Sequence, residues 1–89
     1  MSTISLRTYN REIESMIDQG RVDEAVDHAR HILRKFPKVI DTYRLLGKAY
    51  LEKNRNNDAA DIFQRVLSAV PDDFVAHIGM SLIREEEGN

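Results

Sequence analysis

Cysteine and tryptophan are absent from this sequence, and aromatic residues are few, with three Tyr and three Phe among 89 residues. Without cysteine, the chain has no disulfide, no thiol nucleophile and no zinc–thiolate site. No run of apolar residues approaches the roughly 18–20 that a membrane span requires. The formal net charge of −2 provides no basic field to attract nucleic acid. We therefore expect a soluble, cytoplasmic protein that binds neither membrane nor nucleic acid.

The composition is typical of a folded helical protein. Apolar residues make up 42% of the chain and charged residues 31%, a balance unlike that of disordered proteins. Arg7, Arg11 and Glu12 interrupt any apolar run near the N-terminus that could form the core of a signal peptide. At this length we expect one domain, spanning residues 1–89.

The stretch from Ile40 to Pro71 has the pattern of a helical hairpin. Apolar or small side chains recur at i, i+3, i+4 and i+7, which places them on one face of a helix, at Tyr43, Leu46, Gly47 and Tyr50. A polar turn follows at residues 54–57, and a similar spacing then resumes at Ala59, Phe63, Val66 and Leu67. Pro71 ends the segment, because proline does not continue a helix.

The whole chain repeats with a period of 34 residues. Identical residues at this offset are Tyr9/Tyr43, Arg21/Arg55, Ala25/Ala59, Asp27/Asp61, Leu33/Leu67 and Pro37/Pro71. This period predicts an all-α fold in which repeat 1 spans about 6–39 and repeat 2 about 40–73. The first helix of an incomplete repeat 3 then spans about 74–87.

The period and the motif Tyr-x2-Leu-Gly-x2-Tyr, Ala-x3-Phe, Pro resemble the tetratricopeptide repeat (TPR), with Tyr43 where that family most often has Trp. The resemblance implies an α-α superhelix, or solenoid, of two helical hairpins followed by a fifth, unpaired helix. It also implies a protein–protein interaction module, whose first helices line a concave surface that receives a peptide or protein segment.

Several helix ends follow from local residues. We expect the first helix to run from Ile4 to Gln19, with a cap at Ser2, Thr3 or Ser5 and a left-handed residue at Gly20. The second is expected from about Arg21 to Phe36. Asp72 or Asp73 should cap the last helix, which is expected to reach about Glu87. Ile13 stands where the second repeat has Gly47, so the first hairpin should pack less closely.

Helical geometry also predicts which residues face the concave surface. At 100° per residue, the side of the helix after Ile40 that lies opposite its core stripe carries four charged residues, Asp41, Arg44, Lys48 and Glu52. The residues 34 positions earlier and later occupy the same side of the first and last helices. The predicted peptide groove is formed by Asn10, Glu14, Asp41, Arg44, Lys48, Glu52, Ile78 and Leu82. It runs from mixed charge at its N-terminal end to apolar at its C-terminal end, which suits a partner with an apolar anchor next to charged residues. The alternative interpretation is an ordinary solvated face.

The last helix is apolar over most of its length, although the terminal helix of a solenoid normally has a polar outer side. Three explanations compete: the chain is an N-terminal fragment of a longer TPR protein, the helix pairs with a second copy in a homodimer, or it packs back on its own chain. We favour the fragment. The alternative function is therefore self-association through this helix. Recognition of RNA is a third, less favoured function, because the rows of residues that would contact RNA are acidic.

Other functional motifs are weak. The carboxylate clamp of Lys and Asn residues with which some TPR domains bind chaperones is absent, since its positions carry Asn10, Glu14, Leu45, Val75 and Gly79. Glu24, His28 and His31 could share one side of a helix as a metal triad, but no fourth ligand is placed beside them and surface histidines are common.

We expect His77 to be a packed or boundary residue rather than a catalyst. The sequence has no Gly-rich phosphate loop, nucleophile motif or paired carboxylates in a cleft, so we expect no cofactor, no metal and no enzymatic activity.

Overall fold

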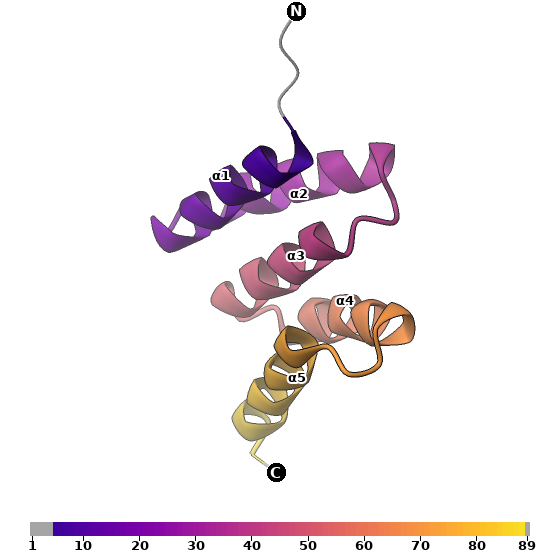
Figure 1. Cartoon of the computed structure of the whole chain (residues 1–89). Helices are drawn as coiled ribbons and strands as arrows, with labels where there is room; N and C mark the ends of the chain where they lie inside the picture. Colours follow the sequence, from indigo (N-terminus) through magenta and orange to yellow (C-terminus); the bar gives the residue numbers. More distant parts are fainter. Residues whose placement is uncertain (1–4, 89) are drawn as a thin grey trace, which may run out of the picture.

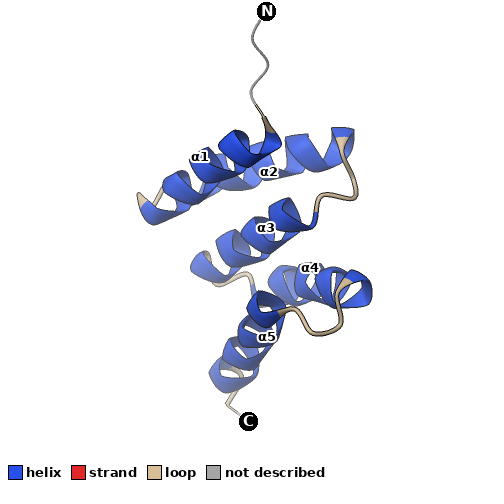
Figure 2. Cartoon of the chain, in the orientation of Figure 1, coloured by secondary structure: helices blue, strands red, loops and turns tan. Residues whose placement is uncertain are grey.

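The computed structural model describes residues 5–88, and this part of the chain contains five helices and no strand (Figures 1 and 2). The helices are α1 (Leu6–Asp18), α2 (Val22–Lys35), α3 (Ile40–Glu52), α4 (Asn56–Ala69) and α5 (Phe74–Glu86). The predicted all-α fold is confirmed.

The helix ends have local causes. Ser5 caps α1, because its side-chain oxygen accepts a hydrogen bond from the Thr8 backbone N–H at 3.1 Å. The expected start at Ile4, and the candidate caps Ser2 and Thr3, lie outside the described residues. Asp73 caps α5 by accepting from the Ala76 backbone N–H at 2.9 Å.

The turns that follow the first helices need a left-handed residue. Gly20 has φ +81° after α1, and Asn54 has φ 60° after α3. Glycine adopts this conformation without strain, and asparagine is among the residues that tolerate it best. Gly88 has φ +79° after α5, so a left-handed residue follows all three first helices, each time 34 residues further along the chain.

The helices stack as an α-α superhelix of two hairpins and a fifth helix, as the repeat predicts. Helix α3 packs against all four other helices. Figure 1 shows the α1–α2 hairpin followed by α3 and α4, with α5 at the C-terminal end. The result is elongated, with extents of 52 × 28 × 19 Å. One continuous core runs through it, from Ile13 in α1 to Ile83 in α5.

The core is built differently at its two ends. In the second half, the fully buried ring of Phe63 lies between two glycines of neighbouring helices. A methyl group added at Gly47 would lie 2.6 Å from Phe63 Cε1, and one added at Gly79 would lie 2.3 Å from Phe63 Cε2. Both helices can therefore approach α4 only because these side chains are missing.

The first half has the opposite size pattern. The residues 34 positions before Gly47, Phe63 and Gly79 are Ile13, Ala29 and Leu45. A large residue thus stands on each first helix and a small one on the second helix. Helix α1 packs less extensively on α2 than α3 packs on α4, which agrees with the looser contact expected from Ile13.

No helix within residues 5–88 has the length and apolar character needed to cross a membrane.

Candidate functional site

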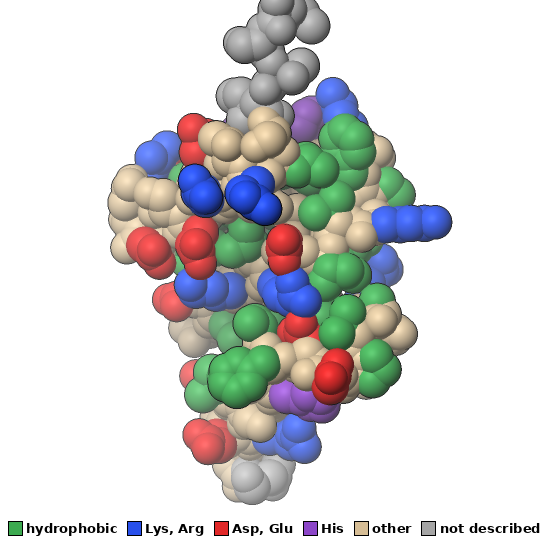
Figure 3. All heavy atoms as spheres, in the orientation of Figure 1, with side chains coloured by type: hydrophobic (Ala, Val, Ile, Leu, Met, Phe, Trp, Pro, Cys, Tyr) green, Lys and Arg blue, Asp and Glu red, His purple; other side chains and the backbone are tan. Residues whose placement is uncertain are grey.

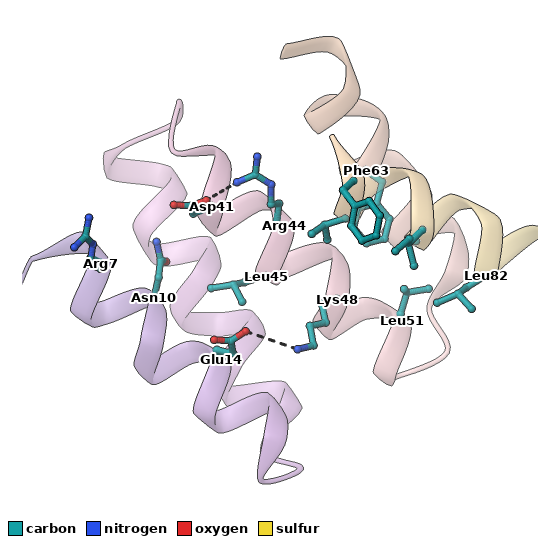
Figure 4. Close-up of a pocket in the computed structure, with 14 residues that line it drawn as sticks. Arg7, Asn10, Glu14, Asp41, Arg44, Leu45, Lys48, Leu51, Phe63 and Leu82 are labelled. Atoms are coloured by element: carbon teal, nitrogen blue, oxygen red, sulfur yellow. Dashed lines mark hydrogen bonds and ion pairs between the residues drawn. The ribbon is translucent and has the colours of Figure 1, made fainter. Parts of the chain in front are cut away.

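The first helices of the repeats, α1, α3 and α5, line a hollow of about 530 Å³, which we call the groove (Figure 4). This volume lies within the range of pockets that take small ligands or the side chains of a bound segment. All predicted groove residues except Glu52 line it, namely Asn10, Glu14, Asp41, Arg44, Lys48, Ile78 and Leu82. Glu52 lines an adjoining hollow of about 680 Å³, which shares Lys48, Leu51 and Leu82 with the groove.

Polar side chains in the N-terminal half of the groove bridge α1 and α3. The Thr42 hydroxyl donates to Asn10 Oδ1 at 2.8 Å, and Thr42 is fully buried. Lys48 Nζ lies 3.9 Å from a Glu14 carboxylate oxygen and 4.0 Å from one of Asp18. Figure 4 shows Lys48 reaching from α3 toward Glu14 on α1. These groups thus hold the two helices together as well as lining the groove.

Arg44 makes the corresponding bridge from α3 to α5. Its Nε donates to Asp73 Oδ1 at 2.7 Å, and its guanidinium also pairs with Asp41. Asp73 is buried, with 6% of its surface exposed. The hydrogen bond from Arg44 lowers the pKa of the Asp73 carboxyl and raises the pKa of the Arg44 guanidinium. Arg44 is therefore held within the fold, and it also secures the residue that caps α5.

The C-terminal half of the groove is apolar. Four side chains of α5 form what we call the apolar wall, and their exposed fractions are 75% for Phe74, 41% for Val75, 44% for Ile78 and 48% for Leu82. Phe63 forms the floor between Gly47 and Gly79. Figure 3 shows charged side chains of both signs gathered over α1 and α3, with a hydrophobic cluster over α5.

Two of the three residues considered for metal binding have other partners. Glu24 forms an ion pair with Arg21, which lowers the pKa of the Glu24 carboxyl. The Tyr9 hydroxyl lies 2.7 Å from His28 Nδ1. Within residues 5–88, no group of three or more His, Asp or Glu side chains is placed to hold a metal ion.

His77 is exposed, so the expectation of a packed or boundary residue is wrong. Its Nε2 lies 2.8 Å from the Pro71 carbonyl oxygen, which draws the ring to the surface at the start of α5. Tyr43, 34 residues earlier, makes the equivalent contact by donating from its hydroxyl to the Pro37 carbonyl at 2.9 Å.

Phe63 and Phe74 line the groove but were not among the residues predicted for it. The sequence assigned Phe63 to the core on its helical spacing and its place in the Ala-x3-Phe motif. The available signal was a pair of glycines, Gly47 and Gly79, inside two expected helices, since glycine in a helix interior is costly and usually marks a close approach.

Comparison with known families agrees with the geometry. A family model described as tetratricopeptide repeat matches residues 16–82. The comparison with curated proteins gave no match. TPR domains generally mediate protein–protein interactions and are not catalytic. The repeat length, the stacked hairpins and this match together show that the chain belongs to the tetratricopeptide-repeat family.

Proposed function

We propose that the groove binds a segment of another protein. The observation that carries this proposal is the apolar wall, where Phe74, Ile78 and Leu82 are exposed on the side of α5 that lines the groove. Exposed apolar side chains that lie together in a concavity are typical of an interaction site, whereas single ones on a surface are ordinary.

The position of the wall on α5 supports a ligand rather than a further repeat helix. In α3, the stripe Tyr43, Leu46, Gly47 and Tyr50 faces the core, and Gly47 lies against Phe63 of the hairpin partner α4. The residues 34 positions later are His77, Met80, Ser81 and Arg84. His77, Ser81 and Arg84 are exposed and polar. The side of α5 on which a hairpin partner would pack is therefore mostly polar, and the apolar side is the one that faces the groove.

A peptide-display library tests the proposal directly. Selection on the immobilised protein should yield peptides whose affinity falls about tenfold or more in Ile78→Asp and Leu82→Asp. Phe36→Asp is the matched control, because Phe36 is also 48% exposed and apolar but does not line the groove. Selected peptides that bind all three variants equally well would contradict groove binding.

Self-association is a second candidate function, favoured by the 75% exposure of Phe74 at one end of the wall. It predicts that the protein sediments as a dimer at micromolar concentration and that Leu82→Asp gives monomers. Sedimentation as a monomer at high micromolar concentration would contradict it.

A further inference from the structure

The charges beside the apolar wall point to the chemistry of the partner, an inference that rests on the proposed function of the groove. The adjoining hollow carries three carboxylates, from Glu52, Glu85 and Glu86, which we call the acidic end. Lys48 is the one cation among its described lining residues, and this side chain already leans toward Glu14 and Asp18. The acidic end therefore has negative charge in excess beside an apolar surface.

Within the described residues, none of these three carboxylates has a cationic partner. Within residues 5–88, no Lys, Arg or His nitrogen lies within 4.0 Å of the carboxylates of Glu52 or Glu85. Glu86 accepts a hydrogen bond from the Asn56 amide at 2.8 Å. A ligand with basic side chains next to its apolar residues complements this arrangement of charge.

The backbone requirements of a ligand favour a helix over an extended chain. The wall residues are all apolar, and several polar groups of the N-terminal half already have partners, as in Thr42–Asn10 and Arg44–Asp73. An extended segment lying on this surface would leave backbone N–H and C=O groups without partners, which is unfavourable when they are buried. A helix satisfies its own backbone groups and presents only side chains.

The spacing of the wall also matches a helix. Phe74, Ile78 and Leu82 lie at i, i+4 and i+8, so they form a stripe about 12 Å long along α5. Such a stripe packs against the i, i+4, i+7 stripe of a second helix laid along it.

A second copy of this chain is a poorer occupant than a single helix. A symmetric dimer would use the same surface on both subunits, and this surface is hollow, with Phe63 as its floor. Two hollows facing each other leave a void between them, whereas one convex helix fills the groove.

We propose that the groove binds an amphipathic helix of another protein, with aliphatic residues on the apolar wall and Lys or Arg side chains facing Glu52 and Glu85. The wall supplies most of the affinity. The carboxylates, being exposed, orient the helix and speed its association more than they strengthen binding.

Three labelled peptides of about 15 residues test this proposal by fluorescence anisotropy. The first carries leucine at i, i+4, i+7 and i+11, flanked by lysine. The second has glutamate in place of lysine, and the third keeps the lysines but has proline at its centre, which breaks the helix. We expect only the first to bind, with its affinity reduced about tenfold or more by Ile78→Asp or Leu82→Asp and unchanged by Phe36→Asp.

The double variant Glu52→Gln, Glu85→Gln should weaken the lysine peptide severalfold and reduce the salt dependence of its association. Equal binding of the glutamate peptide would overturn the assigned charge, and equal binding of the proline peptide would overturn the helix. No binding of the lysine peptide, or a protein dimer that Leu82→Asp dissociates, would overturn the proposal as a whole. Groove-dependent library peptides that are acidic or extended would overturn this inference while leaving the proposed function intact.

Discussion

The two interfaces between successive first helices solve the same packing problem in opposite ways. Between α3 and α5, the large residue is on the second helix of the hairpin, where Phe63 lies between Gly47 and Gly79. Between α1 and α3, the corresponding residues are Ile13, Ala29 and Leu45, so the large residues are on the first helices. Only the arrangement between α3 and α5 gives the groove an aromatic floor.

The polar contacts between successive first helices also differ. Residues 10 and 44 occupy equivalent positions, and each reaches the next first helix. Asn10 accepts a neutral hydrogen bond from Thr42, whereas Arg44 forms a charged pair with Asp73. At this position, therefore, a neutral hydrogen bond joins α1 to α3, whereas a partly buried ion pair joins α3 to the start of α5. Four predictions test this comparison, in order of decreasing effect.

Phe63→Ala should lower the free energy of unfolding by about 3–5 kcal/mol, because it removes a fully buried ring and leaves a cavity between three helices. Urea denaturation followed by circular dichroism measures the change. The exposed wall variant Ile78→Ala is the control and should change stability by about 0.5 kcal/mol or less. A loss below about 1 kcal/mol for Phe63→Ala would show that packing of the ring between α3 and α5 contributes little to stability.

Gly79→Ala should destabilise the protein by about 1–3 kcal/mol, since the new methyl group would lie 2.3 Å from Phe63 Cε2 and Gly47 limits how far the ring can retreat. In the Phe63→Ala background the same change should instead stabilise by up to about 1 kcal/mol, because alanine favours the helix and the ring is gone. The reversal is measured as a double-mutant cycle. The same sign in both backgrounds would contradict the sandwiched ring.

Asp73→Asn should cost about 1–3 kcal/mol at neutral pH, because it removes the charged partner of Arg44. The pKa of the Asp73 carboxyl is lowered by that hydrogen bond, so its contribution is complete above the unfolded-state value of about 3.9 and is lost as the pH falls through the lower folded-state value. Denaturation at a series of pH values should therefore show that the difference between parent and variant shrinks below about pH 4. A difference in stability that does not change with pH would show that Asp73 stabilises the protein only by capping α5.

Tyr43→Phe should cost about 0.5–1.5 kcal/mol, because the hydroxyl that donates to the Pro37 carbonyl is removed while the ring is kept. His77→Phe, which removes the equivalent contact with Pro71, should have an effect of similar size or smaller, since His77 is exposed. Thermal melts of the two variants compare the contact in both repeats. A much larger loss for His77→Phe would show that the two are not equivalent.

The sequence predicted the fold well because its signals are periodic. The 34-residue offset located each hairpin, Pro37 and Pro71 marked the ends of the second helices, and helical geometry placed the candidate groove residues on one side. These signals depend on spacing within one helix and on repetition, both of which can be read without knowing how the helices cross.

The contacts between helices were harder to predict. Arg44 looked like a solvent-facing or ligand-binding residue, and its bridge to Asp73 requires that α5 begin beside the middle of α3. Likewise, Phe63 becomes the floor of the groove only because α3 and α5 leave a slot over it. Both features depend on the distance between helices rather than on either helix alone. The use of the groove as a binding site remains a prediction.

The glycine–phenylalanine–glycine sandwich also restricts how relatives of this chain can diverge. A larger side chain at position 47 or 79, or a smaller one at position 63, lowers the stability of the protein when it is introduced alone. We therefore expect substitutions at these three positions to occur together in related sequences. Homologues that acquire a bulky residue on either first helix are expected to carry a small one at position 63. Such homologues would lack the aromatic ring that lies beneath the apolar half of the groove.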